Sequence, residues 1–300
     1  MNMTRDLEIP PLQAWLLAIR PKTLPAAVSP VVVGTALAAR EGALAPLPAV
    51  AALIGAILIQ VGANLANDYF DYVKGADTPM RKGPVRAAQS GLISLANLRL
   101  GIAATFALTV VVGAYLVSVG GWPIVGIGFA SLFSALVYTG GPYPIGYHGL
   151  GDLFVFMFFG VVGVCGTFYV QALSINPLTV AVSIPVGTLT VAILVINNLR
   201  DIETDRQTGK RTLAVAIGPD ITRLEYVLLL VAAYMVPTLV WLLGDSSGWI
   251  LLPWLSLPLA VHLAHSIYMN TQGPALNKTL AATARLDLVF CILLAAGLVL

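Results

Sequence analysis

A polar stripe stands where a long apolar segment of the sequence ends. Its members stand at positions i, i+3, i+4 and i+7, so they share one face of a helix: Asn64, Asn67, Asp68 and Asp71. A carboxylate in a membrane helix costs roughly 2.5–3.5 kcal/mol at the bilayer centre and less near the helix end. The stripe therefore needs positive charge, from basic side chains or from a bound cation.

A second stripe of the same kind follows another apolar segment, and it consists of Asn198, Asp201 and Asp205. Carboxylate oxygens suit hard divalent ions, and Mg²⁺ commonly shares its coordination sphere with water and phosphate oxygens. Two acidic stripes, each followed by basic residues, therefore predict a site for a Mg²⁺-bound diphosphate. The expected metal ligands, all but the third of which are also expected catalytic residues, are Asp68, Asp71, Asp77, Asp201 and Asp205.

The diphosphate also needs neutral donors and positive charge, which amides and basic side chains can supply. The alternative interpretation is that both clusters are solvated charges of two loops outside the bilayer. The asparagines argue against it, because an amide is a poor choice for a lipid-facing position. The expected diphosphate contacts are Asn67, Lys74, Arg81, Asn198, Lys210 and Arg211.

The composition states what kind of protein must position these residues. Of 300 residues, 58% are hydrophobic and only 10% are charged, whereas a soluble domain carries about 25% charged residues. A soluble globular enzyme and a disordered chain are both excluded, which leaves a polytopic membrane protein. A net charge of +2 is too small to indicate a nucleic-acid partner. Cys165 and Cys291 lie in apolar runs at no metal-ligand spacing.

Charge-free stretches long enough for a membrane helix predict about nine spans in one all-α bundle, a single domain covering 1–300. Gly-Pro and Asn-Pro breaks divide two of the longer stretches into pairs of helices. No cleavable signal peptide is expected, because charged residues of both signs precede Trp15. The charge-free stretches are 23–39, 42–67, 100–151 (two helices), 153–199 (two helices), 226–244 and 246–277, and the short apolar stretch 286–300 is the ninth predicted span.

The basic residues predict the orientation of this bundle. With a cytoplasmic N-terminus, fifteen of the sixteen Lys and Arg residues fall on the cytoplasmic side, and Arg40 alone falls on the other. Cytoplasmic loops of membrane proteins carry such an excess. We therefore expect a multi-pass protein of the cell (inner) membrane, in contact with the lipid bilayer, whose acidic stripes both meet the cytoplasmic face.

These motifs resemble those of the UbiA-type membrane prenyltransferases, a family with two aspartate-rich motifs on a nine-helix fold. The family pattern NxxxDxxxD on the second helix is matched by Asn67 and Asp71, and DxxxD on the sixth by Asp201 and Asp205. Position 75, where the family has its third aspartate, is glycine, and Asp77 lies two residues further on.

Within that family, the segments RPKTLP, KGAD and NNLRD are similar to those of the enzymes that prenylate 1,4-dihydroxy-2-naphthoate. The resemblance implies transfer of a polyprenyl chain from polyprenyl diphosphate to that acceptor. Diphosphate and CO₂ leave, demethylmenaquinol forms for menaquinone biosynthesis, and Mg²⁺ is the cofactor. Enzymes acting on 4-hydroxybenzoate are expected to carry Lys or Arg in the loop after helix four, and the loop from Tyr138 has neither.

The substrates need further contacts. Tyr138 and Tyr143 are candidates to face the allylic cation through their rings. The naphthoate carboxylate is expected at Arg20 or Lys22, and Asn64 is a further expected substrate contact. Three histidines are weighed as well. His148 is either a base for a naphthol proton or simply solvated, and His262 with His265 lacks a third ligand for a metal site.

Other functions remain open at this point. The donor could be phytyl diphosphate, as in phylloquinone synthesis, and the acceptor could be another aromatic ring. A more distant alternative is a cation-coupled secondary transporter, but transporters place their ion sites near the midplane. The sequence does not reveal prenyl chain length or oligomeric state.

Overall fold

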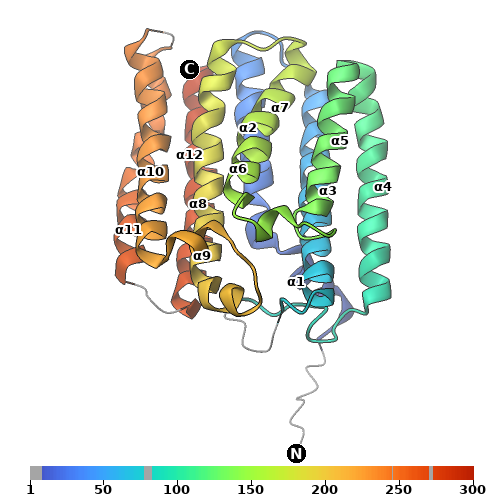
Figure 1. The fold of residues 1–300 in the computed structure, drawn as a ribbon. Helices are drawn as coiled ribbons and strands as arrows, with labels where there is room; N and C mark the ends of the chain where they lie inside the picture. Colours follow the sequence, from blue (N-terminus) through green and yellow to red (C-terminus); the bar gives the residue numbers. More distant parts are fainter. Residues whose placement is uncertain (1–8, 78–82, 245, 270–272) are drawn as a thin grey trace, which may run out of the picture.

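The computed structural model describes residues 9–77, 83–244, 246–269 and 273–300. The regular elements of these residues are all helical, and Figure 1 shows them as an upright bundle. In chain order the elements are α1 (Pro11–Ile19), η1 (Pro21–Thr23), α2 (Pro25–Arg40), α3 (Pro46–Val73), α4 (Leu95–Gly120), α5 (Trp122–Val137), η2 (Ile145–Tyr147), α6 (Gly151–Val155), η3 (Phe156–Val162), α7 (Gly163–Ala172), α8 (Pro177–Gln207), α9 (Leu213–Ile217), α10 (Pro219–Leu242), η4 (Gly248–Ser256), α11 (Leu257–Met269) and α12 (Gly273–Val299).

Local sequence explains where several helices begin. Proline occupies the first position of α2, α3, α8 and α10, where its missing N–H is not needed and its fixed φ suits the helix. The Asn176 side chain caps α8 by accepting a hydrogen bond from the Thr179 amide at 2.8 Å. The predicted breaks at Gly120-Gly121 and at Asn176-Pro177 are confirmed, because α5 and α8 begin there.

Helix α8 lies at the centre of the bundle and packs against α10 and α12, while α12 also packs along α2. The seven residues of η3 form a π-helical turn that contacts α8 through glycine. A Cβ built on Gly160 would lie 2.7 Å from the Cα of Gly187. Only two glycines allow the backbones of η3 and α8 to approach this closely.

Fewer than nine of the described helices have the length and composition expected of a membrane span. In the described part of the chain, seven helices are long and apolar enough to cross a membrane. An eighth candidate is a bent pair, Pro11–Thr23 with Pro25–Arg40, which turns by 49° at its break. The 16-residue helix α5 is apolar but shorter. The nine-helix count and the orientation of the N-terminus stay predictions.

The predicted bounds of the last span, 286–300, are wrong. Helix α12 begins at Gly273, because Lys278 and Arg285 are part of the helix and point their side chains outward, where both are exposed. A search for charge-free stretches cannot include such residues.

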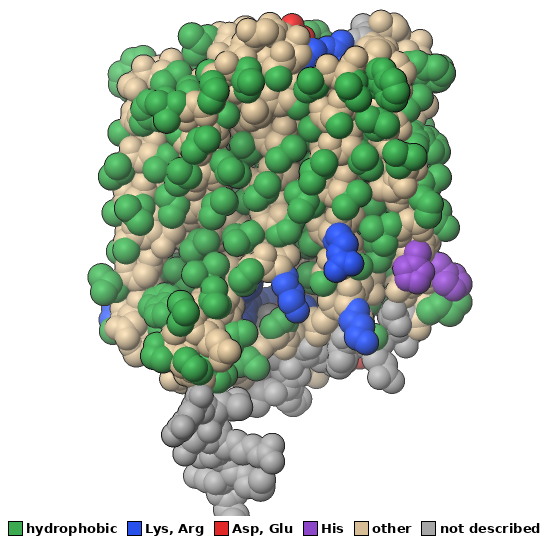
Figure 2. All heavy atoms as spheres, turned by 180° about the vertical axis from the view of Figure 1, so that it is seen from behind, with side chains coloured by type: hydrophobic (Ala, Val, Ile, Leu, Met, Phe, Trp, Pro, Cys, Tyr) green, Lys and Arg blue, Asp and Glu red, His purple; other side chains and the backbone are tan. Residues whose placement is uncertain are grey.

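The outer surface of the bundle is the apolar one. Figure 2 shows a face covered mainly by hydrophobic side chains, with Lys, Arg and His gathered toward the lower end and few charges at the other end. The lower end is also where α3 and α8 finish (Figure 1), so both acidic stripes lie at the same end of the bundle.

Candidate active site

A cavity of about 830 Å³ joins the two acidic stripes. Asn67 and Asp71 at the end of α3 line one side of it, and Asn198, Asp201 and Asp205 at the end of α8 line the other. The helices therefore bring together five residues that the sequence analysis singled out. We call this space the main cavity.

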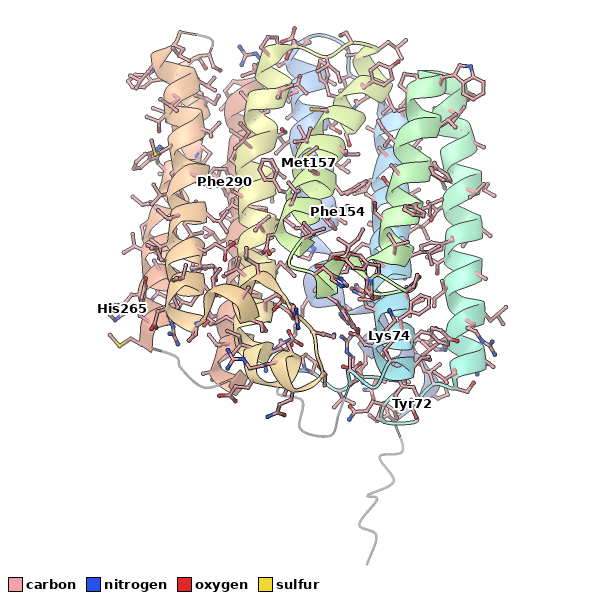
Figure 3. All side chains as sticks on the ribbon, in the orientation of Figure 1. Tyr72, Lys74, Phe154, Met157, His265 and Phe290 are labelled. Atoms are coloured by element: carbon pink, nitrogen blue, oxygen red, sulfur yellow. The ribbon has the colours of Figure 1, made fainter. Side chains whose placement is uncertain are left out.

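Away from the aspartates the main cavity is apolar. It continues between α4, α5, η3 and α7 as far as Val117 and Ile124, beside the α4–α5 turn at the opposite end of the bundle. Phe154, labelled in Figure 3, is part of its wall. Val110 on α4 and Phe129 on α5 line the cavity and are 57% and 72% exposed. The cavity therefore reaches the outer, apolar surface between α4 and α5.

Asp71 is held by three side chains that come from distant parts of the sequence. Its carboxylate lies 3.1 Å from Arg86 Nη2 and 3.1 Å from Lys210 Nζ, and it accepts a hydrogen bond of 2.7 Å from the Tyr147 hydroxyl. Asp71 and Arg86 are buried. Two cations thus neutralise one buried carboxylate at the cavity wall, as a charge at this depth requires.

Tyr147 lies at the centre of these contacts, and the sequence analysis did not single it out. The Lys210 ammonium lies 4.6 Å from its ring centroid, and that of Lys74 lies 5.3 Å away, distances at which cations interact with aromatic faces. Burial raises the pKa of Tyr147, and the Asp71 carboxylate beside it raises that pKa further. The phenol therefore stays a hydrogen-bond donor to Asp71.

Asp201, on the other side of the cavity, has a different partner, which the sequence analysis also missed. The Arg200 guanidinium donates to both oxygens of the Asp201 carboxylate, at 2.8 Å from Nε and 2.5 Å from Nη2. The same guanidinium donates to Asn277 on α12 and to Asn197, each at 2.8 Å. This bidentate pairing fixes the direction in which Asp201 points.

Asp68 and Asp77 do not line the main cavity. The Asp68 carboxylate accepts hydrogen bonds from the backbone amides of Ala87 and Ala88, at 3.0 and 3.4 Å. Asp77 lies 3.2 Å from Arg86 Nε. In this structure both aspartates thus hold the segment that carries Arg86, and Arg86 in turn reaches Asp71. The metal-binding role predicted for them stays a prediction that this placement does not favour.

The expected substrate contacts separate into two groups. Arg20, Asn64 and Tyr138 line the main cavity, whereas Lys22 and Tyr143 do not. The Asn64 side-chain amide is already hydrogen-bonded within the protein: it donates to the Ile19 carbonyl at 2.8 Å and to the Thr23 hydroxyl at 3.1 Å.

A smaller cavity of about 410 Å³ lies next to the main one, and its wall includes Lys74, Tyr147, His148 and Arg211. We call it the polar cavity. The Tyr143 ring stacks on His148 with 3.5 Å between ring centroids. Of the cations expected to bind diphosphate, Lys210 lines the main cavity and Lys74 and Arg211 line the polar one, while Arg81 lies outside the described residues.

The remaining two histidines are far from both cavities. His262 and His265 are exposed on α11, and Figure 3 shows His265 at the edge of the bundle, away from Lys74 at the end of α3. Neither histidine lines the main or the polar cavity.

The donor set of the main cavity suits Mg²⁺. Among the described residues, no group of three or more His, Cys, Asp or Glu side chains converges on one point. Mg²⁺ does not require such a group when it binds together with phosphate, because one or two carboxylates then suffice. Asp71, Asp201 and Asp205 supply carboxylates from both sides of one cavity, with amide oxygens of Asn67 and Asn198 close by in sequence.

Comparison with known proteins assigns the fold and the motifs to a family. The UbiA prenyltransferase family matches residues 27–295, nearly the whole chain. The chain belongs to this family. One relative is a 1,4-dihydroxy-2-naphthoate octaprenyltransferase of Escherichia coli (strain K12). The two sequences are 39% identical over an alignment of 301 positions, which covers 98% of this chain and 97% of that protein. An enzyme of the same name from Bacillus subtilis (strain 168) is 32% identical, covering 95% of this chain and 91% of that protein.

A solved structure of a UbiA homolog has the same fold. The homolog, from Archaeoglobus fulgidus and bound to DMAPP and Mg²⁺, superposes with a TM-score of 0.67 at 15% identity. The match covers 95% of this chain and 98% of that one. At this identity the likeness speaks for the UbiA fold alone, and the predicted fold class is confirmed.

Proposed function

We propose that this UbiA family member is a Mg²⁺-dependent prenyltransferase that attaches a polyprenyl chain to 1,4-dihydroxy-2-naphthoate. The donor is a polyprenyl diphosphate, and the products are demethylmenaquinol, diphosphate and CO₂, as in menaquinone biosynthesis. The acceptor is supported by the names of the relatives, which are 32% to 39% identical over nearly the full chain. Residues 1–300 act as one domain.

The observation that carries the proposal is the two-part character of the main cavity. One end holds carboxylates from both motifs with Arg86 and Lys210, and the remainder is a long apolar space that reaches the outer surface. A polyprenyl diphosphate has the same two parts, a small polyanion and a long hydrocarbon. A small ion or polar metabolite would not need the apolar extension.

Several residues of the chain bind and orient the diphosphate in this proposal. Asp71, Asp201 and Asp205 would hold Mg²⁺, which when bound supplies positive charge that stabilises the leaving diphosphate. Lys210 and Arg86 add fixed positive charge at the same end, where negative charge develops as the allylic C–O bond breaks. Arg200 keeps Asp201 in position, and Tyr147 does so for Asp71.

The apolar wall then surrounds the allylic cation that remains when the C–O bond breaks. Water must be kept from it, and the packed walls around the cavity serve that purpose. Burial and the neighbouring carboxylates of Asp152, Asp71 and Asp205 raise the pKa of Tyr138, so its ring faces the cavity as a neutral phenol. The electron-rich naphthoate ring attacks the cation and a carbon–carbon bond forms. The ring then regains its aromatic character with net loss of its carboxylate as CO₂, and diphosphate is the leaving group of the donor.

We further propose that the protein resides in the cell (inner) membrane with the aspartate end at the cytoplasmic face. The excess of Lys and Arg at that end supports this orientation.

Product analysis tests the proposal. The purified protein is incubated with 1,4-dihydroxy-2-naphthoate, geranylgeranyl diphosphate and Mg²⁺, and the prenylated naphthoquinol is sought by mass spectrometry. We expect product with Mg²⁺ and none with EDTA. Prenylation of 4-hydroxybenzoate in place of the naphthoate would overturn the acceptor and keep the reaction class. Folded protein that prenylates no acceptor would overturn the enzyme assignment.

A further inference from the structure

The polar cavity has the character of a small anion site. Lys74 and Arg211 place two positive charges in its wall, and no acidic residue is among the described residues that form it. Lys74 is exposed, and its Nζ donates to the Gly141 carbonyl at 2.8 Å, which places the ammonium at the wall. Arg211 is exposed, and its guanidinium has no hydrogen bond or ion pair with any described residue.

The rest of that wall is apolar or aromatic. Pro142 and Pro144 line it together with Tyr147 and His148. The His148 Nδ1 lies 2.8 Å from the Pro144 carbonyl oxygen, an atom that can only accept, so Nδ1 carries the proton and the imidazole is held in place. Prolines, two rings and two cations suit a planar aromatic acid. At about 410 Å³ the space lies within the range of small-molecule sites.

The polar cavity and the main cavity share a wall. Tyr147 lines both, and its hydroxyl donates to Asp71 in the main cavity. Tyr147 belongs to the three-residue 3₁₀ turn η2, and its carbonyl accepts a hydrogen bond from the Arg211 amide at 2.9 Å. A ligand of the polar cavity therefore lies one side chain away from the aspartates.

We infer that the polar cavity is the receiving site for the aromatic carboxylic acid acceptor, which arrives there from the aqueous side while the lipid donor occupies the main cavity. This inference rests on the proposed function. Lys74 and Arg211 hold the carboxylate, and the tyrosine and histidine rings hold the aromatic plane. Tyr147 stands between this receiving site and the main cavity, where the acceptor meets the allylic carbon of the donor.

The competing ligand for the same cations is diphosphate, the assignment that the sequence spacing favours for Lys74 and Arg211. Three observations favour the aromatic acid. The carboxylates suited to Mg²⁺ line the main cavity. The polar cavity offers only two cations in its described lining, whereas diphosphate needs more positive charge than that. The lining also includes prolines and aromatic rings.

Equilibrium binding without the donor tests the inference. The probe is 1-hydroxy-2-naphthoate, a fluorescent analogue that resists oxidation, titrated into the full-length protein in detergent with EDTA. We expect Arg211→Gln and Lys74→Gln each to weaken binding roughly tenfold, as loss of a charged hydrogen-bond donor does. Arg211→Lys should recover part of the affinity. Lys278→Gln, which removes an exposed cation outside both cavities, should bind as the unaltered protein does.

Two results would overturn the inference: probe binding that Arg211→Gln and Lys74→Gln both leave unchanged, or displacement of the probe by inorganic diphosphate at equal concentration. Steady-state kinetics adds a second readout. The KM for 1,4-dihydroxy-2-naphthoate should rise in Arg211→Gln while the KM for geranylgeranyl diphosphate stays constant, and the reverse pattern would assign Arg211 to the donor. If the unaltered protein prenylates nothing yet binds the probe through Arg211, the proposed function fails and the site stands.

Discussion

Asp71 and Asp201 occupy matching places in the two motifs but are held in different ways. Asp71 is held by two cations and a phenol from three separate segments, whereas Asp201 is held by the arginine that precedes it. Both carboxylates keep a fixed direction before any ligand arrives, so little reorganisation is required when diphosphate binds.

Replacing either carboxylate should remove turnover without unfolding the protein. We expect Asp71→Asn and Asp201→Asn to lower kcat by about 10²–10³, the loss seen when one electrostatic contact to the developing charge is removed. Asp220→Asn serves as the control, because Asp220 is exposed and its ion pair among the described residues is with Arg223. Near-normal turnover in both active-site variants would contradict the assignment.

The anchor of Arg200 on α12 should contribute to stability. Asn277→Ala removes one hydrogen bond from a buried guanidinium, which is expected to cost about 1–3 kcal/mol. Thermal unfolding in detergent measures this loss. In the same variant the Mg²⁺ concentration for half-maximal rate should rise, since Asp201 is held less firmly. An unchanged Tm and an unchanged Mg²⁺ requirement together would show that Asn277 is dispensable.

Tyr138 should make the protein less stable as the pH rises above about 10. Burial raises the pKa of Tyr138 above its ordinary value of 10.0, while the unfolded chain releases that proton near pH 10. The contribution of Tyr138 to stability is therefore full below about pH 10 and is lost as the pH rises further. Above that pH the Tm of the unaltered protein should fall more steeply than that of Tyr138→Phe, and parallel curves would contradict this.

Among the secondary-structure elements, η3 and α8 make a close glycine-to-glycine contact near the site. It sets how far the apolar wall formed by Phe158 and Phe159 stands from Leu194 on α8, all three of which line the main cavity.

A methyl group at this contact should push the two elements apart. Gly160→Ala is expected to destabilise the protein by about 1–3 kcal/mol, because overpacking a dense contact shifts backbone atoms. Gly166→Ala is the matched control on α7, since a Cβ there would meet Ile127 at an ordinary 3.8 Å. Equal Tm values for the two variants would show that η3 can move away freely.

Much of the arrangement was predictable from local sequence, and the limits have a physical cause. Helical spacing placed Asp71, Asp201 and Asp205 on common faces, and Gly-Pro and Asn-Pro steps located the breaks. Spacing did not distinguish Asp68 from Asp71, which lie only about 60° apart around a helix. The roles of Tyr147 and Asn277 could not be predicted, because their partners Asp71 and Arg200 lie 76 and 77 residues away in the sequence.

At the scale of the whole bundle, the length of the main cavity should limit the length of the prenyl chain that the protein accepts. Gly128 on α5 lines the cavity and has no atom within 4 Å of a built Cβ, so a large side chain can enter the space. Gly128→Phe should shift the preferred donor from geranylgeranyl to a shorter diphosphate, measured by competition among donors. Gly126→Phe, on the same helix but facing outward, should keep the original preference.

The side opening of the main cavity, where Val110 and Phe129 meet the exterior, has a consequence for how the enzyme should be assayed. A donor that enters from the bilayer is dissolved in two dimensions, so its mole fraction in the lipid, and not its molarity in the tube, sets the rate. Adding empty vesicles or micelles at constant total substrate should therefore slow the reaction by surface dilution.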